Sequence, residues 1–448
     1  MSEPTEQVDL LLHPDWVLTM VDAPGINTQN SILTNYSVAI LAGKIHSIIP
    51  TVEARQRFLA TFEFNLPNSV VLPGLINSHA HAAMSLFRGF ADDLPLHTWL
   101  TQYIWPAEQK WVSADFVRIG TAWSLLEGLL SGTTCTSDMY FFPEAAAKVA
   151  QEFGVRCLLS SPVFDFPTAW GDSVDTYLQK TEALMIEFRD HPLIKVGVGP
   201  HAPYTVSDQP LIRCVELAKK YNSWVQMHVH ETEQEVTDAV KATGTRPIKR
   251  LHDLGILSSA FQMVHMTALN EEDFDILKKT GASVIHCPQS NLKLASGFCP
   301  VHQLLQQGTR VAIGTDGSAS NNDVDMLDEL KTAALLAKAV AKDATALPAY
   351  HALYLATKSA ADTFGMSNEI GSLAPGLSAD LIAINLSAPN TQPVYDPVSQ
   401  VVYSANSSQV QHVWVRGQHR VAYGEPVDID VKRLLNELKT LQKKLITG

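Results

Sequence analysis

Between residues 67 and 365, the chain alternates between short apolar, strand-like runs and segments with helical spacing. Alternation of this kind is typical of parallel strands joined by helical crossovers, and eight such units close into a (β/α)8 barrel. The eight strand-like runs are 70–75, 133–138, 156–160, 195–199, 224–228, 261–265, 282–286 and 310–314. The sequence therefore predicts an α/β protein with a TIM-type barrel, whose active site lies at the carboxyl ends of the strands.

Both ends of the chain carry further strand-like runs. They are 8–12, 16–20, 37–41, 45–49, 380–384 and 412–416, with a hairpin turn at 42–44. We therefore predict one small β-sandwich domain built from residues 1–66 and 366–430, with the catalytic barrel, 67–365, inserted between them. Residues 431–448 are rich in Leu and Lys at helical spacing, which predicts a C-terminal helix at the surface or at an interface.

Charge and cysteine usage exclude several classes of function. The net charge of −13 argues against a nucleic-acid backbone as the main partner. Neither a signal peptide nor an apolar run of about 18 residues is evident, so we expect a cytoplasmic protein without a membrane partner. The five scattered cysteines form no C-x-x-C pair, which predicts buried, reduced thiols rather than disulfides or a thiolate zinc site.

Polar residues gather where the predicted barrel strands end. His79 and His81 lie two positions apart, and because side chains alternate along a strand, both would point to the same face. The later strand ends carry His201, His228 to Glu231, His265 and Asp316. A single histidine among the sixteen in the chain is usually an ordinary surface or core residue, but polar groups at five strand ends of one barrel indicate a site.

Three imidazoles (His79, His81 and His228) and the carboxylate of Asp316 suit one divalent ion, for which zinc is the predicted metal. Such a site leaves room for a water molecule that the metal would acidify into a nucleophile, and Asp316 could accept its proton. A second metal would need a bridging ligand such as a modified lysine at the end of the fourth strand. The only lysine of that strand, Lys195, lies at its opposite end, which favours a single metal.

These motifs resemble the amidohydrolase superfamily over nearly the whole chain. The resemblance rests on 73–77 with His79-Ala80-His81, on 228–232, on His265, on 314–317 and on 373–381. Finer features are similar to the 5′-methylthioadenosine/S-adenosylhomocysteine deaminase branch. They are 88–94 with Trp99-Leu100, 105–108, 199–201, 290–294 and 318–322.

The resemblance implies hydrolytic deamination of the adenine ring of 5′-modified adenosines, giving 5′-methylthioinosine or S-inosylhomocysteine. A metal-activated water would attack C6 of the ring, and Glu231 would protonate a ring nitrogen. His265 would orient the nucleophile, and Asp316 would pass its proton to the departing ammonia. The expected substrate contacts are Glu108 on the ribose hydroxyls, His201 near the ribose, Trp99, Glu231 and Ser161.

The 5′ end of the substrate is expected to meet an apolar surface. Some family members that handle S-adenosylhomocysteine carry an arginine after the strand that ends here at Ser160-Ser161. The following segment, 162–170, is aromatic and apolar instead. An apolar wall suits a methylthio group, whereas an unpaired carboxylate loses a charge-assisted contact. We therefore expect methylthioadenosine to be preferred over S-adenosylhomocysteine.

The alternatives are another hydrolase on the same scaffold, a catalytically inactive barrel and a cysteine-ligated deaminase of nucleic acids. A guanine deaminase or an s-triazine hydrolase would share the metal ligands, so the metal cannot discriminate between them, although Glu108 and His201 together favour a nucleoside. A catalytically inactive barrel that serves as a scaffold would have lost ligands, and none is missing here. The cysteine-ligated deaminases of nucleic acids are excluded because the P-C-x-x-C signature is absent. Homo-oligomerisation is left open.

Overall fold

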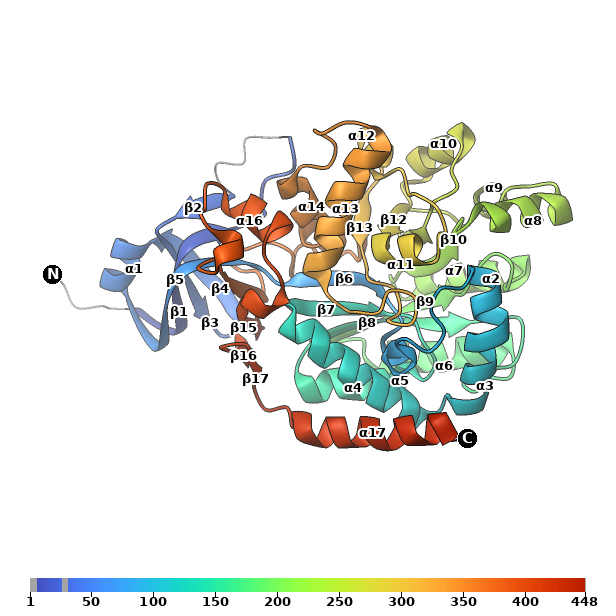
Figure 1. Ribbon diagram of the computed structural model, residues 1–448, viewed down its shortest axis with the longest axis horizontal. Helices are drawn as coiled ribbons and strands as arrows, with labels where there is room; N and C mark the ends of the chain where they lie inside the picture. Colours follow the sequence, from blue (N-terminus) through green and yellow to red (C-terminus); the bar gives the residue numbers. More distant parts are fainter. Residues whose placement is uncertain (1–5, 26–30, 448) are drawn as a thin grey trace.

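The computed structural model describes residues 6–25 and 31–447 and contains a barrel beside a separate mixed sheet (Figure 1). In the described part of the chain, eight parallel strands follow one another in chain order around the barrel, as the sequence predicts. They are β6 (Leu75–Ala80), β7 (Thr133–Asp138), β8 (Arg156–Val163), β9 (Ile194–Pro200), β10 (Val225–Val229), β11 (Phe261–His265), β12 (Ser283–His286) and β13 (Val311–Ile313).

Helices follow the barrel strands and pack around them (Figure 1). Their first residues favour helix initiation, since the side chains of Ser113, Ser173, Thr232 and Asn270 each accept a hydrogen bond from a backbone N–H of the first turn. The helices of this region are η2 (Ala82–Phe87), α2 (Leu96–Thr98), η3 (Trp99–Ile104), α3 (Trp105–Trp111), α4 (Ala114–Leu130), α5 (Pro143–Phe153), α6 (Val174–Glu187), α7 (Asp208–Lys220), α8 (Glu233–Thr243), α9 (Pro247–Asp253), α10 (Glu271–Thr280), α11 (Pro288–Lys293), α12 (Val301–Gln306), α13 (Met326–Ala341), α14 (Ala349–Leu355) and α15 (Lys358–Thr363).

The barrel closes where the end of β13 meets β6. Ala80 and Asp316 form a parallel bridge, and the backbone N–H of Asp316 donates to the carbonyl of His79 at 3.0 Å. A Cβ atom at Gly314 would lie only 2.6 Å from the backbone nitrogen of His79, so only glycine permits this close approach. The closure brings Asp316 beside the histidines of β6 although more than 230 residues separate them in sequence.

The second sheet draws its strands from both ends of the chain, as predicted. In the described residues it has nine strands, and its central strand β5 (Phe58–Pro73) pairs with β1 (Glu6–Leu18) from the N-terminal side and with β14 (Leu381–Asn385) from the C-terminal side. The other strands are β2 (Ile32–Thr34), β3 (Tyr36–Leu41), β4 (Lys44–Pro50), β15 (Val410–Val415), β16 (Gln418–Ala422) and β17 (Glu425–Pro426), with the short helices α1 (Thr51–Arg57), η4 (Pro389–Thr391), α16 (Pro397–Tyr403) and η5 (Ser407–Gln409) beside them.

Two strand predictions at the N-terminal side are wrong in detail. The apolar run 70–72 belongs to β5 of the mixed sheet, and the first barrel strand starts only at Leu75. The predicted strands 8–12 and 16–20 are largely one long strand, β1. The domain boundary predicted at residue 66 falls inside β5, and the division into 1–66, 67–365, 366–430 and 431–448 stays a prediction.

The C-terminal helix α17 (Val431–Thr447) lies along α4 on the outside of the barrel (Figure 1). Arg118 of α4 and Glu437 of α17 form an ion pair at 2.9 Å. All five cysteines are buried and free, as expected. Among the described residues, no helix combines the length and the apolar character needed to cross a bilayer.

Candidate active site

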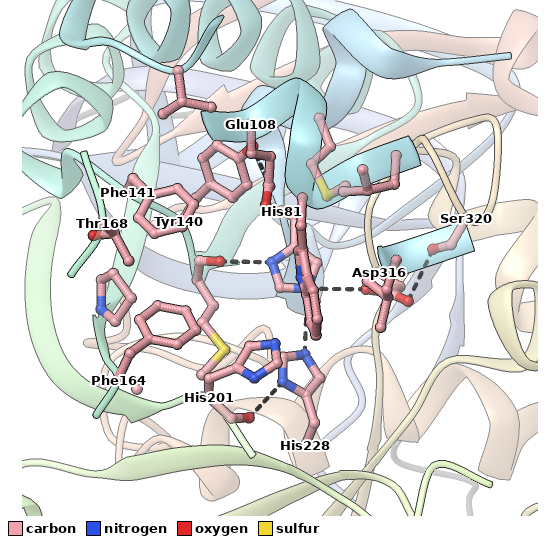
Figure 2. A pocket seen from close by; sticks show the side chains of 18 of the residues that line it. His81, Glu108, Tyr140, Phe141, Phe164, Thr168, His201, His228, Asp316 and Ser320 are labelled. Carbon is pink, nitrogen blue, oxygen red and sulfur yellow. Dashed lines mark hydrogen bonds and ion pairs between the residues drawn. The ribbon is translucent and has the colours of Figure 1, made fainter. Parts of the chain in front are cut away.

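Three imidazoles converge on one point at the carboxyl end of the barrel. The Nε2 atom of His228, on β10, lies 3.2 Å from Nε2 of His79 and 3.3 Å from Nε2 of His81, at the end of β6. The Oδ1 atom of Asp316 lies 3.5 Å and 3.3 Å from the same atoms of His79 and His81. The four residues predicted as metal ligands are therefore brought together, and Figure 2 shows three of them at one end of a cavity.

Each of these imidazoles is oriented through its other ring nitrogen. The Nδ1–H of His81 donates to the carbonyl of Met139 at 2.6 Å, and that of His228 donates to the carbonyl of His201 at 2.7 Å. A carbonyl can only accept, so Nδ1 must carry the proton and Nε2 presents its lone pair. Burial and the neighbouring imidazoles also lower the pKa of His81 and of His228, so both rings are neutral.

His79 is held in the same way by a buried amide. Its Nδ1 lies 2.8 Å from Oε1 of Gln226, and the Gln226 amide N–H groups donate to the carbonyl of Ser78 and to Oε1 of Gln262. Because these two bonds use the amide hydrogens, the Gln226 oxygen faces His79 and accepts from it. A fixed partner on the second nitrogen is the arrangement usually found behind histidine ligands of metals.

Asp316 presents one oxygen to the histidines and has its other oxygen occupied. Its Oδ2 accepts hydrogen bonds from the hydroxyl groups of Ser290, at 2.6 Å, and Ser320, at 3.0 Å. The backbone of Asp316 has φ of 64°, and that of His265 has φ of 79°, both in the left-handed region that non-glycine residues rarely adopt. Such backbone conformations cluster at functional sites, and here they occur where β11 and β13 end.

The donor atoms are close enough for a divalent ion to bind several of them at once. His228 Nε2 lies 3.2–3.3 Å from the Nε2 atoms of His79 and His81, and Asp316 Oδ1 lies 3.3–3.5 Å from the same two atoms, separations of the order found between ligands of one zinc ion. Neutral imidazoles and a carboxylate are also ligands that zinc accepts readily. The residues present therefore fit the predicted metal, and the nitrogens of the three histidines all lie within 4.8 Å of one another.

A cavity of about 570 Å³ opens above the convergence point, a size typical of sites for small molecules. Most of the predicted site residues line it, namely His81, Trp99, Glu108, His201, His228, Glu231, His265 and Asp316. His79 is completely buried beneath it. Ser161 is also completely buried, and the structure does not bring it to the cavity, so its role in substrate binding stays a prediction.

Glu231 and His265 lie near the convergence point. Nε2 of His265 is 3.8 Å from Oε2 of Glu231, and Nδ1 of His265 is fixed by Oδ1 of Asn291 at 2.9 Å. Burial, together with the negative charge of Asp316, raises the pKa of Glu231 to about 8. This shift favours the protonated form of Glu231, which a proton donor requires.

Glu108 lies on α3, further from the metal ligands. The hydroxyl of Tyr140 donates to Oε1 of Glu108 at 2.6 Å (Figure 2). Burial raises the pKa of Glu108 to about 7, and the bond from Tyr140 opposes that shift. The remaining lone pairs of this carboxyl group can accept hydrogen bonds from a ligand in the cavity.

Aromatic rings line one side of the cavity and reach from Phe141 and Phe164 to His201, whose ring centroid lies 5.0 Å from that of His228 (Figure 2). The rings of Phe164 and His201 stack with centroids 5.0 Å apart, and Phe141 stacks on Phe164 at 5.8 Å. Nδ1 of His201 is paired with the hydroxyl of Thr205 at 3.0 Å, and burial lowers the pKa of His201 to about 3. Within the described residues, no lysine or arginine lines this cavity.

Several residues of the site do not follow from sequence motifs. Tyr140 and Phe141 follow the end of β7, so their position after a barrel strand is a signal that could have identified them. Gln226 and Asn291, which orient His79 and His265, carry no such signal because an amide in a strand or helix is usually an ordinary polar residue.

Comparison with known proteins gives a consistent result. The amidohydrolase family matches residues 70–420. A 5-methylthioadenosine/S-adenosylhomocysteine deaminase of Saccharophagus degradans is 46% identical over 437 residues, covering 98% of this chain and 97% of the relative. A 5′-deoxyadenosine deaminase of Methanopyrus kandleri is 41% identical over 380 residues, covering 85% of this chain and 87% of the relative.

A solved structure also has the same fold as this chain. An adenosine deaminase from Xanthomonas campestris with bound zinc superposes with a TM-score of 0.96 at 42% identity, covering 99% of this chain and all of that one. The converging histidines at the mouth of an eight-stranded barrel, and the match over most of the sequence, place this chain in the amidohydrolase family.

Proposed function

We propose that this protein hydrolytically removes the amino group from the adenine ring of 5′-modified adenosines, with one zinc ion at His79, His81, His228 and Asp316. The observation that carries the proposal is the arrangement of one cavity. It has the nitrogens of three histidines and an oxygen of Asp316 close together at one end, the buried Glu231 beside them and Glu108 further out. The names of the relatives, which are deaminases of such nucleosides, support it.

The residues of the chain divide the chemistry between them. A zinc ion held by His79, His81, His228 and Asp316 would supply an acidified water as nucleophile and would stabilise negative charge. Glu231 donates its proton to a ring nitrogen of adenine, which makes C6 more electrophilic. His265, whose Nδ1 is paired with Asn291, presents Nε2 as an acceptor that orients the attacking water. Asp316 accepts the proton from that water and returns it to the departing ammonia.

The outer part of the cavity binds the nucleoside. Glu108 accepts hydrogen bonds from the ribose hydroxyls, and His201 and Trp99 pack against the sugar and the base. The aromatic wall at Phe141 and Phe164 accommodates the 5′ substituent. Because no cation lines the cavity in the described residues, an apolar methylthio group is favoured over a substituent that carries a carboxylate.

The proposal also covers the setting of the reaction. The enzyme acts on a free, small nucleoside in the cytoplasm, without nucleic acid or membrane as a partner. Its state of association is left open.

A substrate panel tests the proposal directly. Ammonia release by the zinc-loaded protein is compared for methylthioadenosine, S-adenosylhomocysteine, adenosine, guanine and an aminotriazine. The 5′-modified adenosines should give the highest kcat/KM. A higher kcat/KM for guanine or the aminotriazine would reject the nucleoside assignment while leaving the family unchanged.

A further inference from the structure

A buried carboxyl group on α13 lies behind the site and has no role in the chemistry described above. Glu329 is completely buried. Burying a carboxyl group is costly unless its oxygens find hydrogen-bond partners. Its partners here are two amides from different parts of the chain: the side chain of Asn321 donates to Oε1, and the backbone N–H of Gln289 donates to Oε2 at 3.4 Å.

The first partner belongs to the loop that carries Asp316. The Asn321 amide also donates to the carbonyl of Thr315 at 2.8 Å, so one side chain connects Glu329 to the residue before Asp316. In the same loop, Ser320 donates to Oδ2 of Asp316. Through Asn321, Glu329 therefore fixes the turn whose left-handed backbone directs Asp316 toward the histidines.

The second partner begins a run of three residues that support the site. After Gln289, the hydroxyl of Ser290 donates to Oδ2 of Asp316 at 2.6 Å, and Oδ1 of Asn291 accepts from His265 at 2.9 Å. Ser290 and Ser320 also lie within 3.0 Å of each other, so the two segments meet at the carboxylate. Glu329 lies behind both segments and contacts each of them.

We propose that Glu329 is a positioning residue. It keeps Ser290 and Ser320, which donate to Asp316, and Asn291, which accepts from His265, in their places, and it thereby determines how tightly the metal is bound. The inference rests on the proposed metal site but not on the identity of the substrate. Glu329 touches neither the cavity nor a metal ligand, and it acts only through Asn321 and the 289–291 segment. Burial, reinforced by the charge of Asp323, raises the pKa of Glu329 well above its usual range. A glutamine at this position keeps one oxygen that can accept from Asn321 or Gln289, but its NH2 group cannot replace the second acceptor.

The test compares Glu329→Leu, which keeps the bulk but removes both acceptors, with the isosteric Glu329→Gln. Zinc affinity is measured by competition with a chelator on folded protein, alongside kcat and KM. Removing the hydrogen-bond partners that orient metal ligands typically weakens metal affinity about tenfold to a hundredfold. We expect a decrease in zinc affinity of this size in Glu329→Leu. kcat should fall while KM for the nucleoside changes little, and Glu329→Gln, which keeps one of the two acceptors, should recover part of both losses.

The matched control is Leu335→Ala, which shortens a half-exposed side chain of the same helix and should leave zinc affinity unchanged. If Glu329→Leu folds poorly, Asn321→Ala tests the same connection. If it folds, the double variant should bind zinc no more weakly than the weaker-binding of the two single variants. A purely structural role would lower the melting temperature of the metal-free protein without changing zinc affinity. Wild-type zinc affinity in folded Glu329→Leu or Asn321→Ala would overturn the inference, whereas failure of the wild type to bind zinc would overturn the proposed function.

Discussion

The two ends of the cavity are built differently. At the inner end, the histidines proposed as metal ligands lie on barrel strands or directly after one, and each has a second partner in the interior, such as Gln226 for His79. At the outer end, the lining comes from helices and loops: Trp99 lies on η3, Glu108 on α3, and the 164–169 segment links β8 to α6. Phe166, in that segment, is 44% exposed, whereas His79 is completely buried.

Because of this difference, the inner end can determine the reaction while the outer end determines which substrate is bound. Strands that hydrogen-bond to neighbours on both sides hold their side chains rigidly, which metal binding and proton transfer require. Loops and short helices tolerate sequence change, so they can alter the substrate without disturbing the reaction. The η3 segment is π-helical, a form that occurs mostly at functional sites, and it places Trp99 in the wall.

The largest expected effect is at the inner end. His81→Ala removes one of four ligands, so the protein should lose most of its metal and nearly all activity together. Elemental analysis and ammonia release measure the two losses. His252→Ala, at an exposed histidine on α9, is the control and should change neither. Full metal occupancy with normal turnover in His81→Ala would show that the metal is bound elsewhere.

The second effect separates proton transfer from metal binding within the inner end. Glu231→Gln keeps the shape of the side chain but cannot donate and recover a proton, so kcat should fall by about 10²–10⁴. The metal content should stay at the wild-type level. Glu233→Gln, two residues further on and exposed, should behave like the wild type. A kcat of Glu231→Gln within a few-fold of the wild type would assign the proton transfer to another group.

How far the sequence predicts the site depends on how local each signal is. His79, His81, His228, His265 and Asp316 are identified correctly as neighbours because each directly follows or ends a strand, and barrel topology gathers strand ends. The identity of a partner such as Gln226 depends on a contact across 147 residues, which no local pattern contains. Ser161 lies on a barrel strand but is buried away from the cavity.

The misassigned strand has a similar explanation. The apolar run 70–72 is continuous in sequence with the first barrel strand, but Pro73 and Gly74 divide the two, and β5 belongs to the other sheet. A run buried on both faces looks the same in either sheet, so periodicity alone cannot assign it. The eight-fold alternation and the β domain from both chain ends were nevertheless predictable, because they depend on many elements rather than on one boundary.

A smaller effect is expected at the outer end, where we propose that Glu108 binds the ribose. Below pH 7 the carboxyl group of Glu108, whose pKa is about 7, is protonated, and above it the group becomes the ionised acceptor that two hydroxyls require. kcat/KM should therefore rise with pH through about 7 and fall again above about 8, where Glu231 loses the proton it donates. Glu108→Gln should abolish this rise and lower kcat/KM roughly 10- to 100-fold, mainly through KM, as expected for a lost charged hydrogen bond.

Tyr140→Phe provides the control for that profile. Removing the hydroxyl that stabilises the ionised form of Glu108 should raise the pKa of Glu108 and move the rise in kcat/KM to higher pH. The pH dependence of kcat/KM is measured for all three proteins with one substrate. An unchanged rise in Glu108→Gln would mean that another group titrates there.

The smallest effect concerns the aromatic wall. Methylthioadenosine should have a higher kcat/KM than S-adenosylhomocysteine, and Phe164→Ala should reduce that advantage by about two- to tenfold, the range of a single sulfur–aromatic contact. Phe62→Ala, at an exposed phenylalanine of the β domain, should leave the ratio unchanged. A clear preference of the wild type for S-adenosylhomocysteine would reject the assignment of the wall, but not the deamination chemistry of the inner end.

The central claim is that the inner end delivers water to C6 of an adenine ring and releases the amino group. The most direct test is to incubate the zinc-loaded protein with methylthioadenosine in ¹⁸O-labelled water and to analyse the products by mass spectrometry. We expect one labelled oxygen on the purine ring for each ammonia released, with the ribose and the 5′ thioether intact. Cleavage of the glycosidic bond, or an unlabelled purine product, would contradict it.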